Sequence, residues 1–455
     1  MGPTFKPSIR RRIGLSCASV ILASAGVSRA APEAARSADA FVDSIGINSH
    51  YGNAGNGPGN AYSNPLLDAK LGELGIRHLR DHTWSDIGLV RIDGLFATHG
   101  VRTNLILGET TRSPAELVDL LKQHPAYEAI EGLNEPDFNT RSYGGFTDNP
   151  AANDYSATKA FQNDLYAAIK GDAQTNHIRV LSPAMGNASK SQFLIGAGFD
   201  VAAMHHYSDG REPTFGLNTA IANLTSLRGT SPTKPLMATE SGYFNQPASS
   251  TGSIPENISG KYMPRLYAEY FNSGVERTYV YELVDQGPNT ANRKENFGLL
   301  RFGMTEKPAF TAMKNTIALL EEPGANFDPG SLDYTLTSAA DISQVHHTLL
   351  QKSDGTFYLL LWQEEPGYNR FAESEIINAP LAVTLTLNQP IDVARTYLPN
   401  QSVAPTATYA GPTVINLSVP DQMLIVELSI PEPGAAGALV GGLAATGLLR
   451  RRRVV

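Results

Sequence analysis

Between residues 41 and 320, short apolar runs rich in β-branched residues alternate with stretches that have the spacing of amphipathic helices. Each of eight such runs is followed by a helical stretch or a long loop. Eight strands connected in this way favour a closed parallel barrel, the (β/α)8 or TIM barrel, over an open doubly wound sheet. We predict the strands at Ser44–Asn48, Ile76–Arg80, Arg102–Leu107, Ala129–Leu133, Arg179–Pro183, Val201–His206, Leu236–Thr239 and Thr278–Leu283.

Helix signals between the runs agree with this pattern. Ser113-Pro114-Ala115-Glu116 has the sequence of a capping box with proline at the first helical position, and the leucines within Leu117–Leu121 form an apolar stripe. Further helices are expected over Ala157–Ile169 and Ala309–Leu320. The loop Arg141–Asn153 follows the fourth strand, on the rim where loops usually border the functional cleft.

The pattern changes after residue 320. Glu322–Asn326 has the composition of a turn, and short strand-like runs separated by Gly, Asn and Pro follow it. Such runs predict a small antiparallel β-sandwich. We place the barrel at residues 41–320 and the sandwich at residues 321–430, with strands at His346–Leu350, Phe357–Trp362, Leu381–Leu387 and Met423–Leu428.

The first thirty residues have the order of an export signal. A basic stretch ending at Arg12 precedes the apolar stretch Ile13–Val27, and Ser28-Arg29-Ala30 has the small-x-small pattern of a cleavage site. The one cysteine of the chain, Cys17, lies inside this segment. Cleavage after residue 30 therefore leaves a mature chain without thiol or disulfide chemistry.

The last twenty-five residues form a second distinctive segment. Pro431-Glu432-Pro433 precedes a short apolar run, Ala435–Leu449, and the arginines Arg450–Arg453. This order resembles the PEP-CTERM sorting signal of bacteria that make exopolysaccharide. The resemblance implies processing by an exosortase, transient membrane anchoring through a short transmembrane helix, and a place at the cell surface or outside the cell. The run is short for a permanent membrane span.

The charge between these ends argues against some partners. Without the nine basic residues and one acidic residue of the two ends, 36 basic and 44 acidic residues become 27 and 43, a net charge of −16. A body this acidic is a poor partner for nucleic acid or an anionic membrane surface. It also mildly disfavours a strongly anionic polymer as substrate.

Two of the predicted barrel strands end in a glutamate followed by a turn. Asn134-Glu135-Pro136 follows the fourth strand, and Glu240 ends the seventh. In a parallel barrel, residues at the carboxyl ends of the strands face the functional rim. Two carboxylates facing each other across a cleft are what cleavage of a glycosidic bond requires. The alternative interpretation is a pair of solvated rim carboxylates.

With these residues in this order, segment 45–320 resembles clan A of the retaining glycoside hydrolases, and the sandwich resembles the accessory domain of several such families. The resemblance implies that Glu135 is the acid/base, Glu240 the nucleophile, and Asn134 a hydrogen-bond partner of the sugar 2-hydroxyl. It also implies catalysis without a cofactor. The two carboxyl groups should then lie roughly 5–5.5 Å apart.

The segment His205-His206-Tyr207 follows the sixth strand. Strand alternation puts His205 and Tyr207 on one face and His206 on the other, so the adjacent histidines do not share one metal ion, and no other metal-ligand spacing occurs in the sequence. The resemblance implies that His205 and Tyr207 hold the nucleophile and contact substrate, with Tyr207 donating a hydrogen bond to Glu240. A structural role is the alternative for the histidine.

Further candidate residues follow the first two strands. The resemblance implies that Arg80 pairs with the nucleophile and keeps it ionised; a surface ion pair is the alternative. His50 and Trp84 are candidates for contact with, or stacking on, the sugar, and a core position is the alternative for Trp84.

The segment after the eighth strand departs from the clan. Many members have a tryptophan there beneath the sugar, whereas this chain has Tyr281-Glu282. We expect Tyr281 to replace the tryptophan as a platform and Glu282 to hydrogen-bond sugar hydroxyls. Because of this departure, the better-known families of the clan do not identify the sugar.

These features predict an exported glycoside hydrolase that cleaves a β-linked polysaccharide or oligosaccharide by double displacement. Transglycosylation on the same scaffold is the nearest alternative. A non-catalytic glycan-binding or structural protein of the exopolysaccharide layer is the alternative from another class, although such a protein has no need of an acid/base pair.

The two ends predict a mature product of about residues 31–433, made by signal peptidase and an exosortase-type enzyme. Intact-mass measurement of the protein from the native envelope and medium checks this. Full-length chain that still bears Arg450–Arg453 and occurs only in the cytoplasm would contradict both export and an extracellular substrate.

Overall fold

The computed structural model describes residues 31–55, 57, 59–82, 85–230, 232–246 and 252–431. The predicted signal peptide, the tail beyond Pro431 and the candidate Trp84 lie outside the described residues. A search of the described helices finds none that is both long and apolar enough to span a bilayer.

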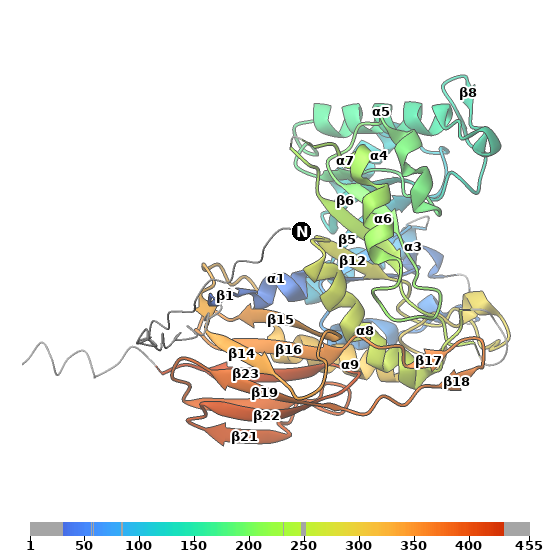
Figure 1. Cartoon of the computed structure of the whole chain (residues 1–455). Coiled ribbons are helices and arrows are strands. Elements are labelled where there is room, and N and C mark those ends of the chain that lie inside the picture. Colours follow the sequence, from blue (N-terminus) through green and yellow to red (C-terminus); the bar gives the residue numbers. More distant parts are fainter. Residues whose placement is uncertain are drawn as a thin grey trace, which may run out of the picture. The chain divides into compact units, whose positions relative to one another are not determined.

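Eight parallel strands form one sheet in the order β10-β11-β12-β3-β4-β5-β6-β9 (Figure 1). A parallel bridge between Leu181 and Val201 links the two outer strands, so the barrel is nearly closed. This confirms the predicted TIM barrel, and each strand end lies within three residues of its prediction. The strands are β3 (Ile45–Asn48), β4 (His78–Asp81), β5 (Arg102–Leu107), β6 (Tyr127–Leu133), β9 (Arg179–Leu181), β10 (Ala202–His205), β11 (Leu236–Ser241) and β12 (Arg277–Val280).

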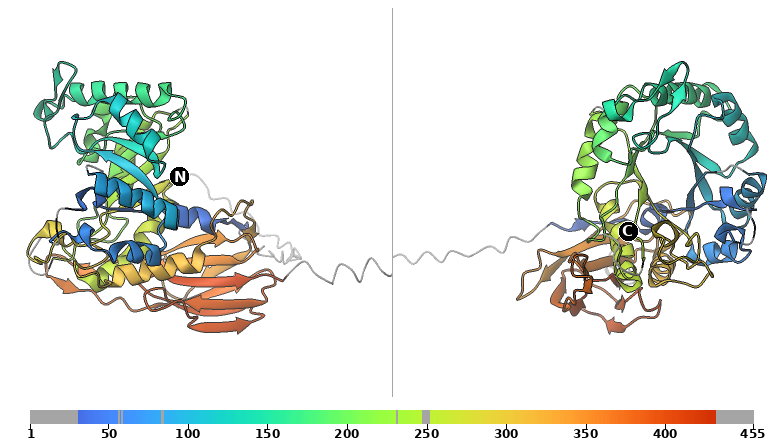
Figure 2. Two further views of the ribbon diagram at one scale, coloured as in Figure 1. Left: turned by 180° about the vertical axis from the view of Figure 1, so that it is seen from behind. Right: turned by 90° about the vertical axis from the view of Figure 1, so that its right-hand side faces the viewer.

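Helices surround the strands, as the right-hand view of Figure 2 shows. At the start of α4, the Ser113 hydroxyl accepts from the Glu116 amide and the Glu116 carboxylate accepts from the Ser113 amide, which is the predicted capping box. The helices are α1 (Ala38–Asp43), α2 (Leu67–Leu74), α3 (Asp86–His99), α4 (Pro114–Gln123), α5 (Ser156–Gly171), α6 (Leu217–Asn223), α7 (Thr225–Arg228), α8 (Glu256–Asn272) and α9 (Pro308–Leu320).

Short elements occupy the connections. A 3-10 segment, η4 (Ala188–Leu194), replaces an α-helix between β9 and β10. The loop after β6 contains a small hairpin of β7 (Ser142–Tyr143) and β8 (Phe146–Thr147). The other 3-10 turns are η1 (Tyr51–Asn53), η2 (Ala61–Ser63), η3 (Pro150–Ala152) and η5 (Arg293–Glu295).

The barrel interior changes from apolar to polar along its axis. An apolar cluster includes Ala129, Leu181, Ala203, Met237 and Tyr279. Nearer the carboxyl ends of the strands, the buried side chains are Asn48, Arg80, Asn104, Glu131 and His205. Charged groups this deep need partners, and the site described below supplies them.

The predicted β-sandwich follows the barrel, in orange and red in Figure 1. Its two sheets have the orders β14-β19-β22 and β2-β15-β16-β23-β20-β21. The strands are β14 (Tyr334–Thr337), β19 (Leu381–Leu387), β22 (Val414–Val419), β2 (Arg36–Ser37), β15 (Val345–Gln351), β16 (Phe357–Gln363), β23 (Leu424–Ser429), β20 (Val393–Tyr397) and β21 (Ala407–Ala410).

Two short N-terminal strands also belong with the sandwich, which the sequence did not predict. β1 (Glu33–Ala34) pairs with β13 (Ser331–Leu332), and β2 pairs in parallel with β15. A further hairpin consists of β17 (Tyr368–Asn369) and β18 (Ser374–Glu375). The first described residues therefore lie on the sandwich, before the chain enters the barrel.

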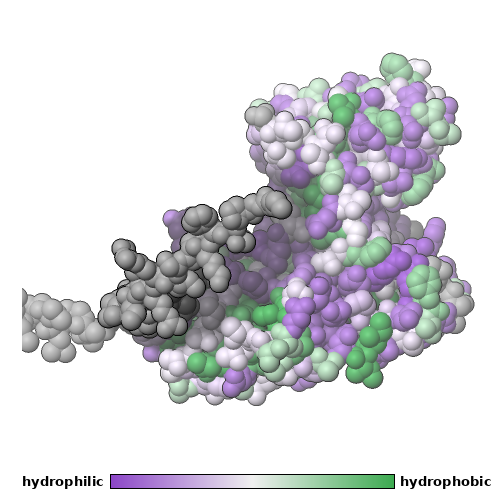
Figure 3. Space-filling view, viewed as in Figure 1, coloured by the Kyte–Doolittle hydropathy of each residue, from purple (hydrophilic) through white to green (hydrophobic). Residues whose placement is uncertain are grey.

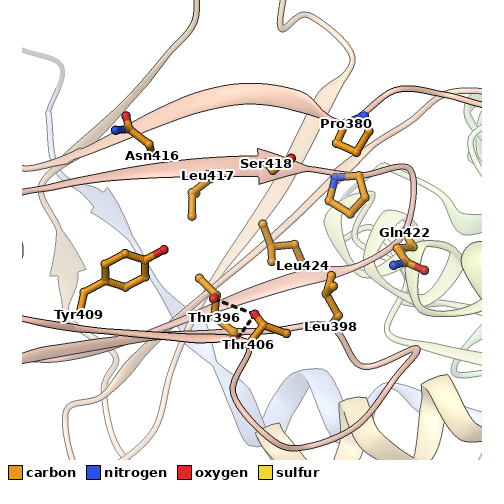
Figure 4. A pocket seen from close by; sticks show the side chains of 11 residues that line it. Pro380, Thr396, Leu398, Thr406, Tyr409, Asn416, Leu417, Ser418, Gln422 and Leu424 are labelled. Atoms are coloured by element: carbon orange, nitrogen blue, oxygen red, sulfur yellow. Dashed lines mark hydrogen bonds between the residues drawn. The ribbon is translucent and has the colours of Figure 1, made fainter.

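A hollow of about 410 Å³ lies in the sandwich (Figure 4). Tyr409, Asn416 and Gln422 are its largest polar lining residues, and leucines and prolines supply much of the rest. Its lining contains no carboxylate, imidazole or amine, so it does not offer acid or base groups for catalysis.

Strand β16 is buried on both faces, which explains its uninterrupted apolar sequence. Leu359 and Leu361 pack between the two sheets of the sandwich, whereas Leu360 and Trp362 belong to the main core that includes the barrel helices. Alternation along one strand thus joins the two domains in one compact unit.

A buried polar network completes this interface. Arg265 of α8 donates through Nε and Nη2 to Glu364, at 2.9 and 2.8 Å. The indole N–H of Trp362 donates to Glu269 at 2.9 Å and to Glu364 at 3.1 Å. The side chains of Arg265 and Glu364 are 0% and 1% exposed, so each charge depends on the other for compensation.

Most of the described surface in Figure 3 is hydrophilic, with apolar residues in small patches. Phe371 and Ile377, near the β17–β18 hairpin, are 80% and 89% exposed. The large apolar side chains are otherwise mostly in the two cores, as expected for a folded globular chain.

We predict that Arg265→Ala lowers the free energy of unfolding by about 3–5 kcal/mol, because it leaves Glu364 buried without a counter-charge. Urea unfolding followed by circular dichroism measures this. The control is Arg179→Ala, which removes a pair with Glu276 whose side chains are 35% and 39% exposed and should cost at most about 1 kcal/mol. Equal losses in both variants would contradict a structural role for the buried pair.

Candidate active site

Glu135 stands just beyond the end of β6, at a sharp turn. Its φ of 45° lies in the left-handed region, which a side chain as long as glutamate rarely adopts. The turn is fixed from both sides, because the Glu135 amide donates to the Ala184 carbonyl at 2.9 Å and its carbonyl accepts from the Phe138 amide at 3.0 Å. Such a strained position, over-determined by its surroundings, is typical of functional sites.

Gly132 lets β6 come close to its neighbours. A Cβ at this position would lie 2.2 Å from Oε1 of Gln162 on α5 and 2.8 Å from the Pro183 nitrogen. Gln162 is fully buried and donates to the carbonyls of Leu181 and Gly198. The glycine therefore allows the close helix–strand packing that sets the height of Glu135 on the rim.

Glu240 lies on β11 and faces Glu135. One carboxylate oxygen of each glutamate and one ring nitrogen of His205 lie within 4.8 Å of one another. The side chains of Glu135 and Glu240 are 27% and 14% exposed, so both are accessible to solvent.

Arg80 of β4 uses all five of its N–H groups. Nε and Nη2 donate to the two oxygens of Glu131, at 2.8 and 3.0 Å. Nη1 donates to Asn48 at 2.7 Å and to Glu240 at 2.9 Å, and Nη2 donates to Oδ1 of Asn134 at 3.0 Å. Arg80 thus orients Glu240 and Asn134 together.

The Tyr207 hydroxyl donates to Oε2 of Glu240 at 2.9 Å, as expected. Burial raises the pKa of the Glu240 carboxyl, but the nearby His205 and the Arg80 guanidinium, together with the hydrogen bonds from Arg80 and Tyr207, hold that pKa below its ordinary value. Glu240 is therefore ionised at neutral pH.

His205 connects the two glutamates. Its Nδ1 lies 3.0 Å from Oε1 of Glu135 and 3.7 Å from Oε2 of Glu240. Its Nε2 lies 3.3 Å from Nη2 of Arg80. His205 is thus closer to Glu135 than to Glu240, whereas His206 turns away and bonds the Phe215 carbonyl.

A pocket of about 200 Å³ opens beside Glu240. His50 and Tyr281, both predicted site residues, line it and lie 3.0 Å apart from His50 Nε2 to the tyrosine hydroxyl. His82, which sequence reasoning did not select, also lines the pocket. Burial, with the charges of His50 and Arg80, lowers the pKa of His82 to about 3, so its imidazole is neutral.

Glu282 is not exposed to this pocket, contrary to expectation. Its side chain is 0% exposed and contacts His50 Nε2 at 3.1 Å. Tyr62 and Gln286 donate to the same carboxylate. Burial lowers the pKa of His50, but Glu282, Asp81 and Glu240 outweigh it and raise the pKa above its ordinary value. Glu282 supports His50 from behind the pocket wall.

Glu135, His205 and Glu240 have a spacing that a metal ion could use. The bonding of these groups fits another role, because Glu240 already receives Arg80 on one oxygen and Tyr207 on the other. A guanidinium at 2.9 Å also supplies the positive charge that a metal would bring.

Sequence reasoning missed Glu131, the main partner of Arg80. Its side chain is fully buried, and Asn104 also donates to it at 2.9 Å. A signal was present, since a glutamate inside the apolar run Ala129–Leu133 must find a partner in the core. Asp81, which also lacked an assigned role, accepts from Ser49 and from the amides of Tyr51 and Gly52, and so anchors the loop after β3.

No protein-family model and no curated protein match this chain, but solved structures do. A family 39 glycoside hydrolase from the gut symbiont Bacteroides cellulosilyticus WH2 has a TM-score of 0.59 at 13% identity, covering 87% of this chain and 81% of that chain. The GH39 enzyme from Xanthomonas axonopodis pv. citri has a TM-score of 0.55 at 16% identity, with coverages of 90% and 100%. A glucosidase from Croceicoccus marinus has a TM-score of 0.60 at 9% identity, with coverages of 88% and 97%.

Identities this low show a shared fold and nothing finer. The similarity extends over most of the chain, so it includes both the barrel and the sandwich. The protein therefore has the fold of glycoside hydrolases, and its chemistry must be argued from its own residues.

We predict that substitutions of two glutamates four residues apart change the free energy of unfolding by very different amounts. Glu131→Gln should lower the free energy of unfolding by about 3 kcal/mol or more, because it breaks a buried ion pair. Glu135→Gln should change it by less than about 0.5 kcal/mol, because that side chain is partly exposed and has one weak partner. Chemical unfolding of both variants measures the difference. A small loss in Glu131→Gln would mean that Arg80 is held without it.

Proposed function

We propose that the protein is an exported retaining glycoside hydrolase that cleaves a β-linked glycan by double displacement. One observation carries the proposal: carboxylate oxygens of Glu135 and Glu240 approach within 4.8 Å across the barrel mouth. Retaining enzymes separate their two carboxyl groups by about 5–5.5 Å, whereas inverting enzymes need about 6.5–9.5 Å to admit a water molecule between them.

Glu240 is the proposed nucleophile. It must be ionised before it attacks the sugar carbon, and its lowered pKa satisfies that requirement. Arg80 and Tyr207 hold one oxygen each, which fixes the direction of the carboxylate. As the ester with the sugar forms, the negative charge leaves Glu240.

Glu135 is the proposed acid and base. In the first step it gives a proton to the departing glycosidic oxygen, and the neighbouring ionised Glu240 favours its protonated form by like-charge repulsion. Once Glu240 is esterified, that repulsion disappears, so Glu135 ionises and takes a proton from the incoming water. His205 Nδ1, 3.0 Å away, holds the carboxyl group in place through both steps.

Asn134, His50 and Tyr281 are the proposed sugar contacts. The Oδ1 of Asn134 accepts from Arg80, which leaves its amide N–H groups for a sugar hydroxyl. Tyr281 presents a ring at the pocket wall, packed edge-on to Phe297 with ring centroids 5.2 Å apart. A ring supported by this packing can take the place of the tryptophan found in many clan A enzymes.

The alternatives make different demands on the site. A transglycosylase would use the same two steps with a sugar as the acceptor instead of water. A non-catalytic glycan-binding protein would gain nothing from a strained Glu135 beside an ionised Glu240. The sequences of the two chain ends support the remaining part of the proposal, which is export and a location at the cell surface.

We predict that Glu240→Ala abolishes turnover of every glycoside. Glu135→Ala should lose on the order of 10²–10⁴ in rate on natural glycans, whose leaving oxygen needs a proton. On aryl glycosides with good leaving groups it should lose much less in the first step, and added azide should restore part of the rate. Steady-state kinetics on both substrate types, with product analysis in azide, make the measurement.

The control is Glu276→Ala. Glu276 precedes β12, at the end of the barrel opposite the site, and its exposed carboxylate pairs with Arg179. This variant should retain full activity. Equal losses of Glu135→Ala on natural and aryl substrates would rule out the acid role. Activity in Glu240→Ala would rule out the nucleophile.

A further inference from the structure

We propose that the pocket beside Glu240 accepts an uncharged sugar and rejects a uronic acid. This inference rests on the proposed glycosidase function and specifies the substrate class of the same site. It follows from how the charges around the pocket are already paired.

The pocket has the size of one sugar unit. Its volume of about 200 Å³ corresponds to about seven water molecules at roughly 30 Å³ each, which is the space of a single monosaccharide. Glu240 and Asn134 both line it, so the sugar that the nucleophile attacks must occupy it. Any carboxylate on that sugar would enter this pocket as well.

Carboxylates outnumber cations around the pocket. Glu240 lines it, whereas Glu131, Glu282 and Asp81 are buried behind its wall. Burial raises the pKa of Asp81 to about 6 despite the opposing effects of His50, Ser49 and nearby backbone amides. At neutral pH Asp81 is thus mostly ionised. Among the basic residues that line the pocket, Arg80 and His50 oppose these four groups, because burial lowers the pKa of His82 to about 3.

Arg80 cannot bind an additional carboxylate. Its five N–H groups donate to Glu131 twice and to Asn48, Asn134 and Glu240 once each. Binding a uronate would require Arg80 to release one of these partners inside a buried site. Each release would leave a polar or charged group unpaired.

The two histidines do not supply a positive site either. His50 Nε2 is already engaged by Glu282, whose side chain is 0% exposed, at 3.1 Å. His50 Nδ1 faces His82 at 3.3 Å, and the low pKa of His82 keeps that ring neutral. Arg293 lies over the Phe244 and Phe297 rings and does not line the pocket.

A neutral sugar meets none of these obstacles. Its hydroxyls can accept from the Asn134 amide and exchange hydrogen bonds with the Tyr281 hydroxyl, and no new charge is buried. Like-charge contact in a desolvated site costs enough to reduce kcat/KM on the order of 100-fold. The preference therefore comes from repulsion of the acidic sugar as much as from attraction of the neutral one.

The test uses purified full chain and pairs of aryl β-glycosides that differ only at C6: glucoside against glucuronide, and galactoside against galacturonide. We expect the neutral member of any pair that is cleaved to have a kcat/KM at least about 100-fold higher. Equal or faster cleavage of a uronide overturns the inference while leaving the glycosidase function intact.

Binding provides a second readout that does not need turnover. Saturation-transfer NMR with glucose, glucuronate, galactose and galacturonate should detect a neutral sugar in preference to its acid. Neutral binding without any cleavage would sink the glycosidase function but support the inference. Preferred binding of a uronate, or binding of none of the four sugars together with no cleavage, overturns it.

Glu282→Gln tests the cause. Without Glu282 the pKa of His50 falls, because that carboxylate is the main group that raises it, but His50 Nε2 becomes available to take a proton and donate to a uronate carboxylate. The ratio of uronide to neutral kcat/KM, or of binding signals, should therefore rise about 10-fold. Glu276→Gln, remote from the pocket, should leave the ratio unchanged. An unchanged ratio in folded Glu282→Gln contradicts the electrostatic explanation; if this variant does not fold, the substrate pairs alone decide.

Discussion

The guanidinium of Arg80 holds the candidate site together. It sits inside the barrel on β4 and bonds side chains that come from β3, β6 and β11, with His205 of β10 also in contact. A single flat group with five donors can connect so many strands because its geometry is rigid. The barrel must close for these strands to surround one point, so the fold and the site depend on the same contacts.

Burying this charge has a cost that Glu131 offsets. Without Glu131, Arg80 would form a full ion pair with Glu240, and its other N–H groups would lack a charged acceptor. Glu131 takes two of those donors in a bidentate contact, which leaves Arg80 to give Glu240 one hydrogen bond and a nearby positive charge. Glu240 is thus held ionised, and its second oxygen accepts from Tyr207.

The barrel could be predicted from the sequence, whereas the polar network could not, and the reasons are physical. Strands such as Tyr127–Leu133 and Arg102–Leu107, which ends in Leu-Ile-Leu, are recognisable because each contains a short local cluster of apolar residues. Glu135 and Glu240 stand at strand ends, where the fold itself directs them to the rim. Glu131 pairs with Arg80, 51 residues away, and Glu282 accepts from Tyr62, 220 residues away. Strands β1 and β2 are only two residues long. The local sequence pattern does not identify which distant residue each of these groups pairs with.

The sandwich is tied to the functional rim through one carboxylate. Oε2 of Glu364 accepts from Arg265 and Trp362, while its Oε1 accepts from the amide and hydroxyl of Thr214. Thr214 belongs to the loop that begins just after Tyr207, and Arg370 from the β17–β18 hairpin bonds Asp209 in the same loop. Because Tyr207 donates to Glu240, the sandwich contacts a loop on which the geometry of Glu240 depends. The accessory domain therefore contributes to the site by limiting the movement of this loop, even though the sandwich residues identified here do not line the pocket.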